Sequence, residues 1–318
     1  MKKQIKKNKA ILAALAANTI IALMKFIIAA FSNSASLFSE AIHSSADALN
    51  QIVLLIGKKQ GKKSPDAKHQ FGHARATFFA SFCVAALLFF VGGVYSGMEA
   101  IEKISHTLHE TGEHVLDMTA LLIAAGILIL SIILEIFSLR TALKEVEEEQ
   151  EKNGSSSRGL IKFYKETRNS SLIVIVTEDL TAIFGLGLAL TGVVLTLITG
   201  NPLWDAIGGV AIGFLLIVAA FILGKEIASL IIGESLPTEK VKEIENLINQ
   251  IQFVQCKQVK SVAIGEECIV VEVDVIFKSE LSTKDITTAI QEIKQKIKRL
   301  WGNNEDIHVS TCIEAVTA

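Results

Sequence analysis

Six long apolar stretches decide what this chain can fold into. Each is near the roughly 20 residues that a helix needs to cross the hydrocarbon layer of a bilayer. The 318 residues are 50% hydrophobic, with a mean hydropathy of +0.46 and 3 prolines. The stretches lie at about 11–31, 36–57, 78–101, 117–139, 171–199 and 203–224. The sequence therefore predicts an α-helical membrane protein with six transmembrane helices.

The distribution of lysine and arginine predicts the orientation of these helices. The amino terminus and the second and fourth connections are rich in both residues, whereas Lys103 is the only one in the alternate connections. By the positive-inside rule, both termini are expected to be cytoplasmic. The lysine-rich start leads into a stretch too long for a signal peptide, so we interpret it as a cytoplasmic flank. The formal net charge of −2 averages two different surfaces and does not indicate nucleic-acid binding.

The composition changes to that of a soluble domain beyond Gly233. Apolar periodicity there predicts helices and strands in the order helix 238–250, strand 258–264, strand 268–277, helix 283–300 and strand 306–312. This order gives a small α+β domain, αββαβ, with its helices on one face of the sheet. We therefore expect a six-helix transmembrane domain at 1–234 and a cytoplasmic domain at 235–318. The four cysteines have neither disulfide nor zinc-knuckle spacing, so we expect reduced thiols.

A polar stripe in the second apolar stretch carries the strongest functional signal. Its members recur at steps of three and four and so share one helix face: Ser36, Glu40, His43, Asp47 and Asn50. Ionisable groups in a spanning helix are costly, normally face a bundle interior and mark an ion or proton path. His43 and Asp47 are one turn apart and can converge on one divalent cation. The alternative is a histidine hydrogen-bonded to a carboxylate as packing between helices.

A second acidic group lies in the fifth stretch, at the adjacent residues Glu178 and Asp179. No lysine or arginine in that stretch can neutralise them, so we expect their partner to be a cation or protons shared with the stripe. In the first stretch, Asn18 is expected to hydrogen-bond between helices. Lys25 is expected to extend its ammonium group to the outer interface.

Two further groups of histidines lie in predicted loops. Asp66, His69 and His73 have spacings of three and four, which suit a metal if the loop is locally helical, although a solvated loop is the commoner outcome. The outer loop after the third stretch carries three more histidines, for which we favour a hydrated loop over metal binding: His106, His109 and His114.

Taken in order, these features resemble the cation diffusion facilitators. The resemblance covers nearly the whole chain and rests on six spans, the His43/Asp47 pair, the loop Asp66-x-x-His69-x-Phe71-Gly72-His73, the acidic fifth span, Asp205-Ala206-Ile207-Gly208-Gly209 at the start of the sixth, and the αββαβ tail. Glu178-Asp179 in place of the usual His-x-x-x-Asp, with Glu135 and Arg140 in the fourth span, is similar to the zinc transporter nine branch.

The resemblance implies a homodimeric exporter that exchanges a divalent metal, usually Zn²⁺, for protons, with a metallochaperone-like cytoplasmic domain. By motif match, His43, Asp47 and Asp179 take three of the four transport-site positions. The fourth position is Ile175, which cannot ligate, and we expect the longer arm of Glu178 to replace it. Asp66, His69 and His73 match a second site. The tail retains only His308 of the family's histidines, so we expect it to form dimers rather than bind metal.

The sequence is compatible with more than one transported metal and with more than one class of function. A carboxylate in place of an imidazole makes the site harder, which could admit Mn²⁺, Fe²⁺ or Co²⁺. The metal is then cargo, no resident cofactor is expected, and the partners are metal ions, protons and lipid, with the plasma (inner) membrane of a prokaryote as the location. An intramembrane metalloenzyme could use His43, Asp47 and Asp179 to activate water, but the chain lacks a His-Glu-x-x-His signature. A metal sensor would bind without flux.

Overall fold

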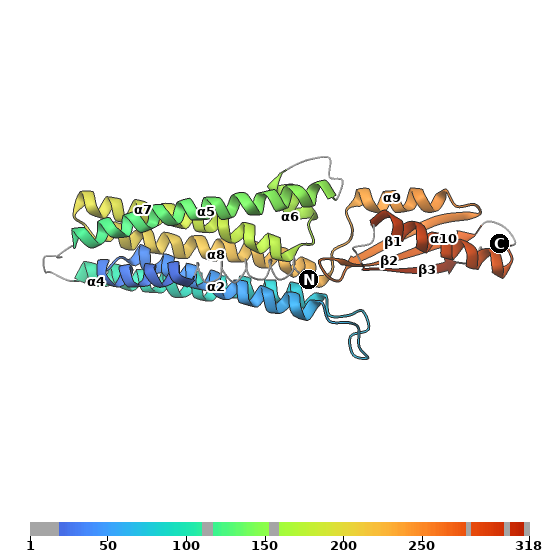
Figure 1. The fold of residues 1–318 in the computed structure, drawn as a ribbon, viewed down its shortest axis with the longest axis horizontal. Helices are drawn as coiled ribbons and strands as arrows, with labels where there is room; N and C mark the ends of the chain where they lie inside the picture. Colours follow the sequence, from blue (N-terminus) through green and yellow to red (C-terminus); the bar gives the residue numbers. More distant parts are fainter. Residues whose placement is uncertain (1–18, 110–116, 153–158, 278–280, 302–305, 315–318) are drawn as a thin grey trace, which may run out of the picture. The chain divides into compact units, whose positions relative to one another are not determined.

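The structure, a computed structural model, describes residues 19–109, 117–152, 159–277, 281–301 and 306–314 (Figure 1). The chain forms two compact units. The first combines Met1–Ile56, Ala80–Arg158 and Ser171–Glu226; the second combines Gly57–Phe79, Gly159–Ser170 and Ile227–Ala318. Each unit is described by itself below.

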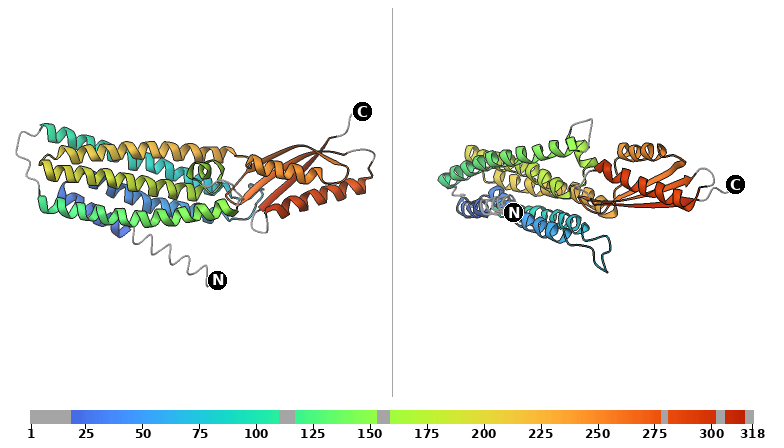
Figure 2. Two further views of the ribbon diagram at one scale, coloured as in Figure 1. Left: turned by 90° about the horizontal axis from the view of Figure 1, so that it is seen from above. Right: turned by 45° about the vertical axis from the view of Figure 1, so that its right-hand side comes forward.

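Long helices that run side by side build the first unit (Figures 1 and 2). Four of them are long and apolar enough to cross a membrane: Arg75–His109, Met118–Glu151, Ser170–Thr199 and Leu203–Ile232. The first of these consists of α3 (Arg75–Leu87), the π-helical segment η1 (Leu88–Tyr95) and α4 (Ser96–His109). The others are α5 (Met118–Lys152), α7 (Ser170–Thr199) and α8 (Leu203–Ile232).

Two more helices correspond to the first and second predicted spans. The first described helix, Thr19–Ser32, is a shorter apolar helix, and the predicted span reaches back into residues outside the described part, as does Asn18. Helix α2 (Ala35–Gly61) has 27 residues. At about 1.5 Å per residue it is long enough to span a bilayer, but its polar stripe lowers its hydropathy below that of the other four. Apolar composition alone therefore supports four spans in the described part of the chain.

Glycines allow α8 to pack directly against the third apolar helix. A Cβ atom at Gly213 would lie 2.7 Å from the Cα of Gly97 in α4, and a Cβ at Gly209 would lie 2.9 Å from the Cβ of Ala100. A Cβ at Gly93, within η1, would lie 2.6 Å from the side chain of Ile217. Gly209 and Gly213, one turn apart, thus form a close-packing step, because a larger residue at either position would force the helices apart.

The second unit contains the predicted αββαβ domain. Its elements are α9 (Thr238–Asn249), β1 (Val254–Ala263), β2 (Cys268–Phe277), α10 (Thr283–Trp301) and β3 (Asp306–Glu314). Strand β2 is central, antiparallel to β1 and parallel to β3. The predicted order is confirmed. Strand β1 begins at Val254 rather than at residue 258, because a bulge between Cys256 and Gln258 breaks the alternation that the sequence analysis required.

Both helices cover one face of this sheet (Figure 2). Alternate residues of β2 from Ile269 to Phe277 are buried, and they share one apolar core with Ile244 and Ile248 of α9 and with Ile293 and Ile297 of α10. Alternation in β2 and helical periodicity in α9 and α10 point to the same core, which is why the sequence pattern was sufficient to predict this domain. The other face of the sheet carries polar side chains of the three strands, among them Lys260, Glu272 and Cys312.

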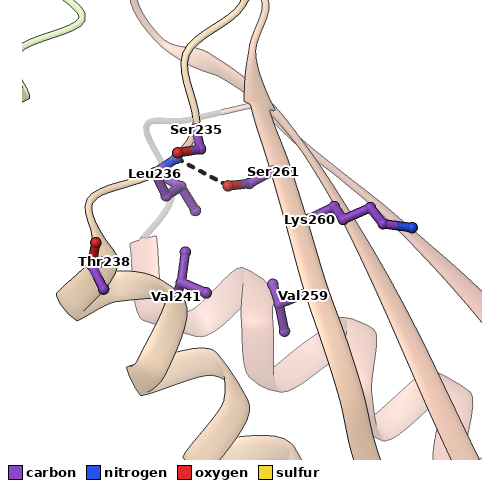
Figure 3. A pocket seen from close by; sticks show the side chains of 7 residues that line it. All are labelled: Ser235, Leu236, Thr238, Val241, Val259, Lys260 and Ser261. Atoms are coloured by element: carbon purple, nitrogen blue, oxygen red, sulfur yellow. Dashed lines mark hydrogen bonds between the residues drawn. The ribbon is translucent and has the colours of Figure 1, made fainter.

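A cavity of about 360 Å³ lies where the segment after α8 meets α9 and β1 (Figure 3). The backbone N–H of Leu236 donates to Ser261 Oγ at 2.9 Å, and the N–H of Ala263 donates to the carbonyl of Glu234 at 2.8 Å. Lys260, the one charged residue of the lining, extends away from the other labelled side chains in Figure 3. The cavity therefore marks where the tail domain is attached to the chain before it.

Candidate functional site

Asp205 at the start of α8 fixes the amino-terminal end of α2. The backbone N–H of Ala35 donates to Asp205 Oδ2 at 2.5 Å, Ser34 Oγ donates to Asp205 Oδ1 at 2.6 Å, and the hydroxyl of Ser36 donates to the same oxygen. A carboxylate at this end satisfies free N–H groups and lies at the positive end of the helix dipole. The sequence analysis did not find this role, because 169 to 171 residues separate the partners and no local pattern signals the contact.

His43 and Asp47 lie together on the buried stripe of α2. The His43 side chain is 1% exposed, and its Nε2 is 3.6 Å from Asp47 Oδ2, beyond hydrogen-bond distance. Both ring nitrogens of His43 and Asp47 Oδ1 are buried without a hydrogen-bond partner in the described part of the chain. The hydrogen bond that the packing alternative requires is therefore absent from this pair. An imidazole and a carboxylate with free lone pairs, one turn apart, are suited to bind a divalent cation.

The two carboxylates of α7 are held by neighbouring helices. Asp179 accepts a hydrogen bond from Ser138 Oγ of α5 at 2.9 Å, and Glu178 Oε1 accepts one from Asn50 Nδ2 of α2 at 2.5 Å. Both side chains are buried. Among the described residues, neither carboxylate joins His43 and Asp47 in a set of three ligand atoms all within 4.8 Å of one another. The structure thus brings the α2 pair together and connects Glu178, through Asn50, to the same stripe.

Lys25 does not extend to the interface, so that prediction was wrong. Its side chain is 2% exposed, its Nζ lies 3.4 Å from Glu40 Oε2, and it donates to Ser44 Oγ at 2.8 Å. Glu40 belongs to the α2 stripe and provides an opposite charge inside the bundle. Because a counter-ion is within reach, the ammonium group is stabilised in the interior instead of at the headgroups.

Asp66, His69 and His73 form a compact group in the loop after α2. Asp66 Oδ1 lies 3.2 Å from His69 Nδ1, Asp66 Oδ2 lies 3.4 Å from His73 Nε2, and the imidazole centroids are 4.4 Å apart. One ligand atom from each residue falls within 4.8 Å of the others. The local helix expected for this grouping is absent: Asp66 instead accepts the backbone N–H groups of Lys68 and His69, which bends the loop into a turn. These N–H groups, that of His69 foremost, lower the pKa of Asp66.

Contacts within the second unit anchor this loop to the tail domain. The ring of Phe71 meets that of His308 edge to face, with centroids 5.6 Å apart. A Cβ at Gly265, in the turn between β1 and β2, would lie 2.3 Å from the Cβ of Ala74, so only glycine allows this approach. The loop histidines and the last strand of the tail therefore belong to one packed structure.

A third group of potential ligands lies on the open face of the sheet and was not predicted: Glu272, Asp274 and Cys312. Lys260 Nζ lies 3.7 Å from Glu272 and 3.4 Å from Asp274. A hydrogen bond to Asp274, with the charges of both carboxylates, raises the pKa of Lys260, so the two acids already have a cationic partner. Only the strand register brings these residues together, and the sequence does not display that register.

The outer histidines lie on a helix rather than in a loop. His106 and His109 are in the last turn of α4, where His106 is 3.8 Å from Glu102 and His109 Nδ1 lies 2.7 Å from the Ser105 carbonyl. The loop prediction for these two was wrong, because the helix continues through its amphipathic end. The third, His114, lies outside the described residues.

Comparison with known proteins then decides the family. Residues 11–232 match the cation efflux transmembrane domain family. The chain belongs to the cation efflux family. It is therefore a multi-pass integral membrane protein of a transporter family and not an enzyme, which removes the metalloenzyme alternative. The sequence-based identification as a cation diffusion facilitator is confirmed.

Three relatives extend this result. The chain is 30% identical over 296 residues to the proton-coupled zinc antiporter SLC30A9, mitochondrial, of Mus musculus, covering 91% of this chain and 50% of that protein. It is 27% identical over 237 residues to metal tolerance protein C4 of Arabidopsis thaliana, covering 74% of this chain and 50% of that protein. It is 26% identical over 296 residues to the uncharacterized transporter MJ0449 of Methanocaldococcus jannaschii, covering 92% of this chain and 94% of that protein. The chain spans about half the length of the first two relatives.

Proposed function

We propose that this protein exports a divalent cation across a membrane in exchange for protons, with Zn²⁺ as its main cargo. The observation that carries the proposal is the pair His43 and Asp47 on α2, where three buried ligand atoms have no hydrogen-bond partner in the described part of the chain. A relative of this chain is a proton-coupled zinc antiporter, which supports both the cargo and the exchange.

Competition for the same lone pairs couples the two fluxes. A carboxylate buried in an apolar bundle is unfavourable as a bare anion, so the empty site holds protons on its carboxylates or imidazole. A metal ion binds to deprotonated ligands and therefore displaces these protons. Each transport cycle then exchanges metal for protons at one place.

The proposed ligands are His43, Asp47 and Asp179, with Glu178 in place of the histidine that Ile175 replaces. The burial of His43, Glu178 and Asp179 supports this set, with Asp47 18% exposed, as does the hydrogen bond between Glu178 and Asn50 of the stripe. Three carboxylates and one imidazole form a harder site than the usual one, so Mn²⁺, Fe²⁺ and Co²⁺ are alternative cargoes.

The proposal includes six spans, with the first and second formed by the helix around Thr19–Ser32 and by α2. Both termini are cytoplasmic by the lysine and arginine asymmetry. Residues 1–234 form the transport domain and residues 235–318 form the cytoplasmic domain. Two copies pair through the cytoplasmic domain to form a homodimer. The dimer lies in the plasma (inner) membrane of a prokaryote. The glycine contacts between α4 and α8 support a fixed pair of helices against which the first helix, α2, α5 and α7 move.

Sealed proteoliposomes with a zinc dye and a pH dye inside test this proposal. We expect Zn²⁺ entry to be accompanied by proton exit, and an imposed pH gradient to drive Zn²⁺ against its own gradient. Mn²⁺, Fe²⁺ and Co²⁺ added in parallel measure selectivity. Binding without flux would identify a sensor, and zinc flux that ignores the pH gradient would contradict antiport.

The loop group provides a separate prediction. A His69→Ala/His73→Ala double variant should bind one fewer Zn²⁺ per chain and transport more slowly, because two of the three loop ligands are removed while the α2 pair is untouched. Calorimetric stoichiometry in detergent measures the first effect. The exposed pair His106 and His109 provides the matched control, since its double alanine variant also removes two surface imidazoles. Unchanged stoichiometry in the loop variant would restore the solvated-loop interpretation.

The low pKa of Asp66 predicts how loop binding depends on pH. A carboxyl whose pKa is depressed keeps its charge down to a pH below its ordinary value of about 4, so Asp66 is ionised throughout the range of about pH 5 to 8. Loss of loop-bound metal on acidification within that range is then not due to protonation of Asp66. Asp66→Asn should weaken binding by a similar factor at every pH in that range. A loss confined to one end of it would show that Asp66 itself titrates there.

A further inference from the structure

The ion pair between Lys25 and Glu40 lies beside the proposed transport site but is not part of it. Lys25 is the only lysine or arginine among the buried side chains of the residues that the structure describes. Both side chains are almost fully buried, with Nζ and Oε2 3.4 Å apart. Burying two charges is expensive and seldom stabilises a fold more than apolar residues would, so the pair calls for an explanation beyond packing.

The position of the pair connects it to His43. Glu40 precedes His43 by three residues on the same stripe, and Lys25 donates to Ser44, the next residue after His43, at 2.8 Å. The ammonium group therefore lies within about one helical turn of the proposed ligands. It comes from a different helix, Thr19–Ser32, so its charge is added to the stripe by tertiary packing.

The surroundings of Glu40 leave room for a carboxylate. Its Oε1 is buried without a hydrogen-bond partner in the described part of the chain. A Cβ added at Gly185 of α7 would lie 2.5 Å from this oxygen, so the glycine is what admits it. Glu40 thus has one oxygen near Lys25 and one free, in a space bordered by α2 and α7, the helices that carry the proposed ligands.

We infer that Lys25 is a specificity-determining residue that sets the charge of the transport site and limits it to one divalent cation. This inference rests on the proposed function. Glu40 and His43, at i and i+3, form a second carboxylate–imidazole pair on the same face as His43 and Asp47. The ammonium group of Lys25 forms an ion pair with Glu40 and repels a second cation. Metal is therefore bound on the Asp47 side of His43.

The signs of the effects separate this role from a structural one. Lys25→Met removes the positive charge and leaves Glu40 free, so Zn²⁺ should bind about tenfold more tightly or in one additional equivalent per chain. Glu40→Gln leaves an unpaired ammonium near the site, so Zn²⁺ should bind about tenfold more weakly. The double variant Lys25→Met/Glu40→Gln removes both charges and should bind as the wild type does. A pair that only stabilises the fold predicts no such opposition.

The test is calorimetric titration of the full-length protein in detergent with ZnCl₂, in a His69→Ala/His73→Ala background that removes the loop group. Opposite shifts in the two single variants, cancelled in the double variant, are the expected result. Shifts in the same direction, or none, would overturn the inference. If the single variants do not fold, Lys25→Arg and the double variant suffice: both should retain one zinc at wild-type affinity, and a loss in either would contradict the charge-setting role.

One further variant separates this inference from the function on which it depends. His43→Ala should abolish Zn²⁺ binding in the same background. Zinc binding that survives His43→Ala would refute the proposed transport site. Binding that is lost in His43→Ala, with Lys25→Met and Glu40→Gln both unchanged, would refute the role of Lys25 alone.

Discussion

Alanine at Asp47 is expected to abolish metal-driven proton movement in proteoliposomes, with flux at least a hundredfold below that of the wild type. Asp47 contributes the carboxylate of the α2 pair, 3.6 Å from His43, and one of its oxygens is buried without a partner among the described residues. Loss of groups that only support a metal ligand already costs about 10- to 100-fold, so loss of the ligand itself should cost more. Parallel measurement of zinc and pH inside the vesicles detects both fluxes.

Matched variants make this expectation specific. Ser45→Ala alters the same turn of α2, but its hydroxyl only donates to the Ala41 carbonyl of its own helix, so flux should remain near wild type. Ser138→Ala removes the hydrogen bond to Asp179 while retaining the carboxylate, and should slow flux by about tenfold. Each variant should elute as the wild-type species in size-exclusion chromatography. Wild-type flux in Asp47→Ala would show that the site has been assigned to the wrong residues.

Local sequence patterns were sufficient where the interacting residues are close in the chain. The steps of three and four in α2 predicted a buried stripe and placed His43 beside Asp47, because helical geometry alone brings i and i+4 together. Alternation in β2 predicted the core of the tail domain for a similar reason. In both cases one element contains the whole signal, and the fold only has to bury the face that the pattern defines.

Contacts between distant segments could not be predicted in this way. Lys25 was expected at the interface because it lies close to one end of its predicted span, whereas its partner Glu40 lies 15 residues away on another helix. Asp205 and Asn50 were likewise visible as polar residues but not as the cap of α2 and the partner of Glu178. Metal binding by the loop group was made conditional on a local helix, but the side chain of Asp66 accepts hydrogen bonds from the loop backbone and the same residues come together in a turn.

The second large expected effect is on Zn²⁺ affinity, and it concerns Glu178 and its hydrogen bond with Asn50. Glu178 Oε1 accepts from Asn50 Nδ2 at 2.5 Å, so this carboxylate contacts the α2 stripe. Its side chain is buried, and helical side chains generally lean toward the amino terminus, which is the direction of Ile175. If Glu178 replaces the missing histidine as a ligand, its charge is essential. If it is only a packing partner of Asn50, its hydrogen bond is enough.

Glu178→Gln separates these two roles, because glutamine keeps the size and an oxygen that can accept from Asn50 but removes the charge. As a ligand, Glu178 should be sensitive to this change, and Zn²⁺ affinity should fall by about 100-fold or more in calorimetry, beyond the loss expected for a supporting group. Asn50→Ala is the matched control, since it removes the hydrogen bond and retains the carboxylate, and it should have the smaller effect. Adding Ile175→His to Glu178→Gln should restore binding and shift preference from Mn²⁺ toward Zn²⁺, because imidazole is the softer ligand. Wild-type affinity in Glu178→Gln would instead leave a site of His43, Asp47 and Asp179 completed by water.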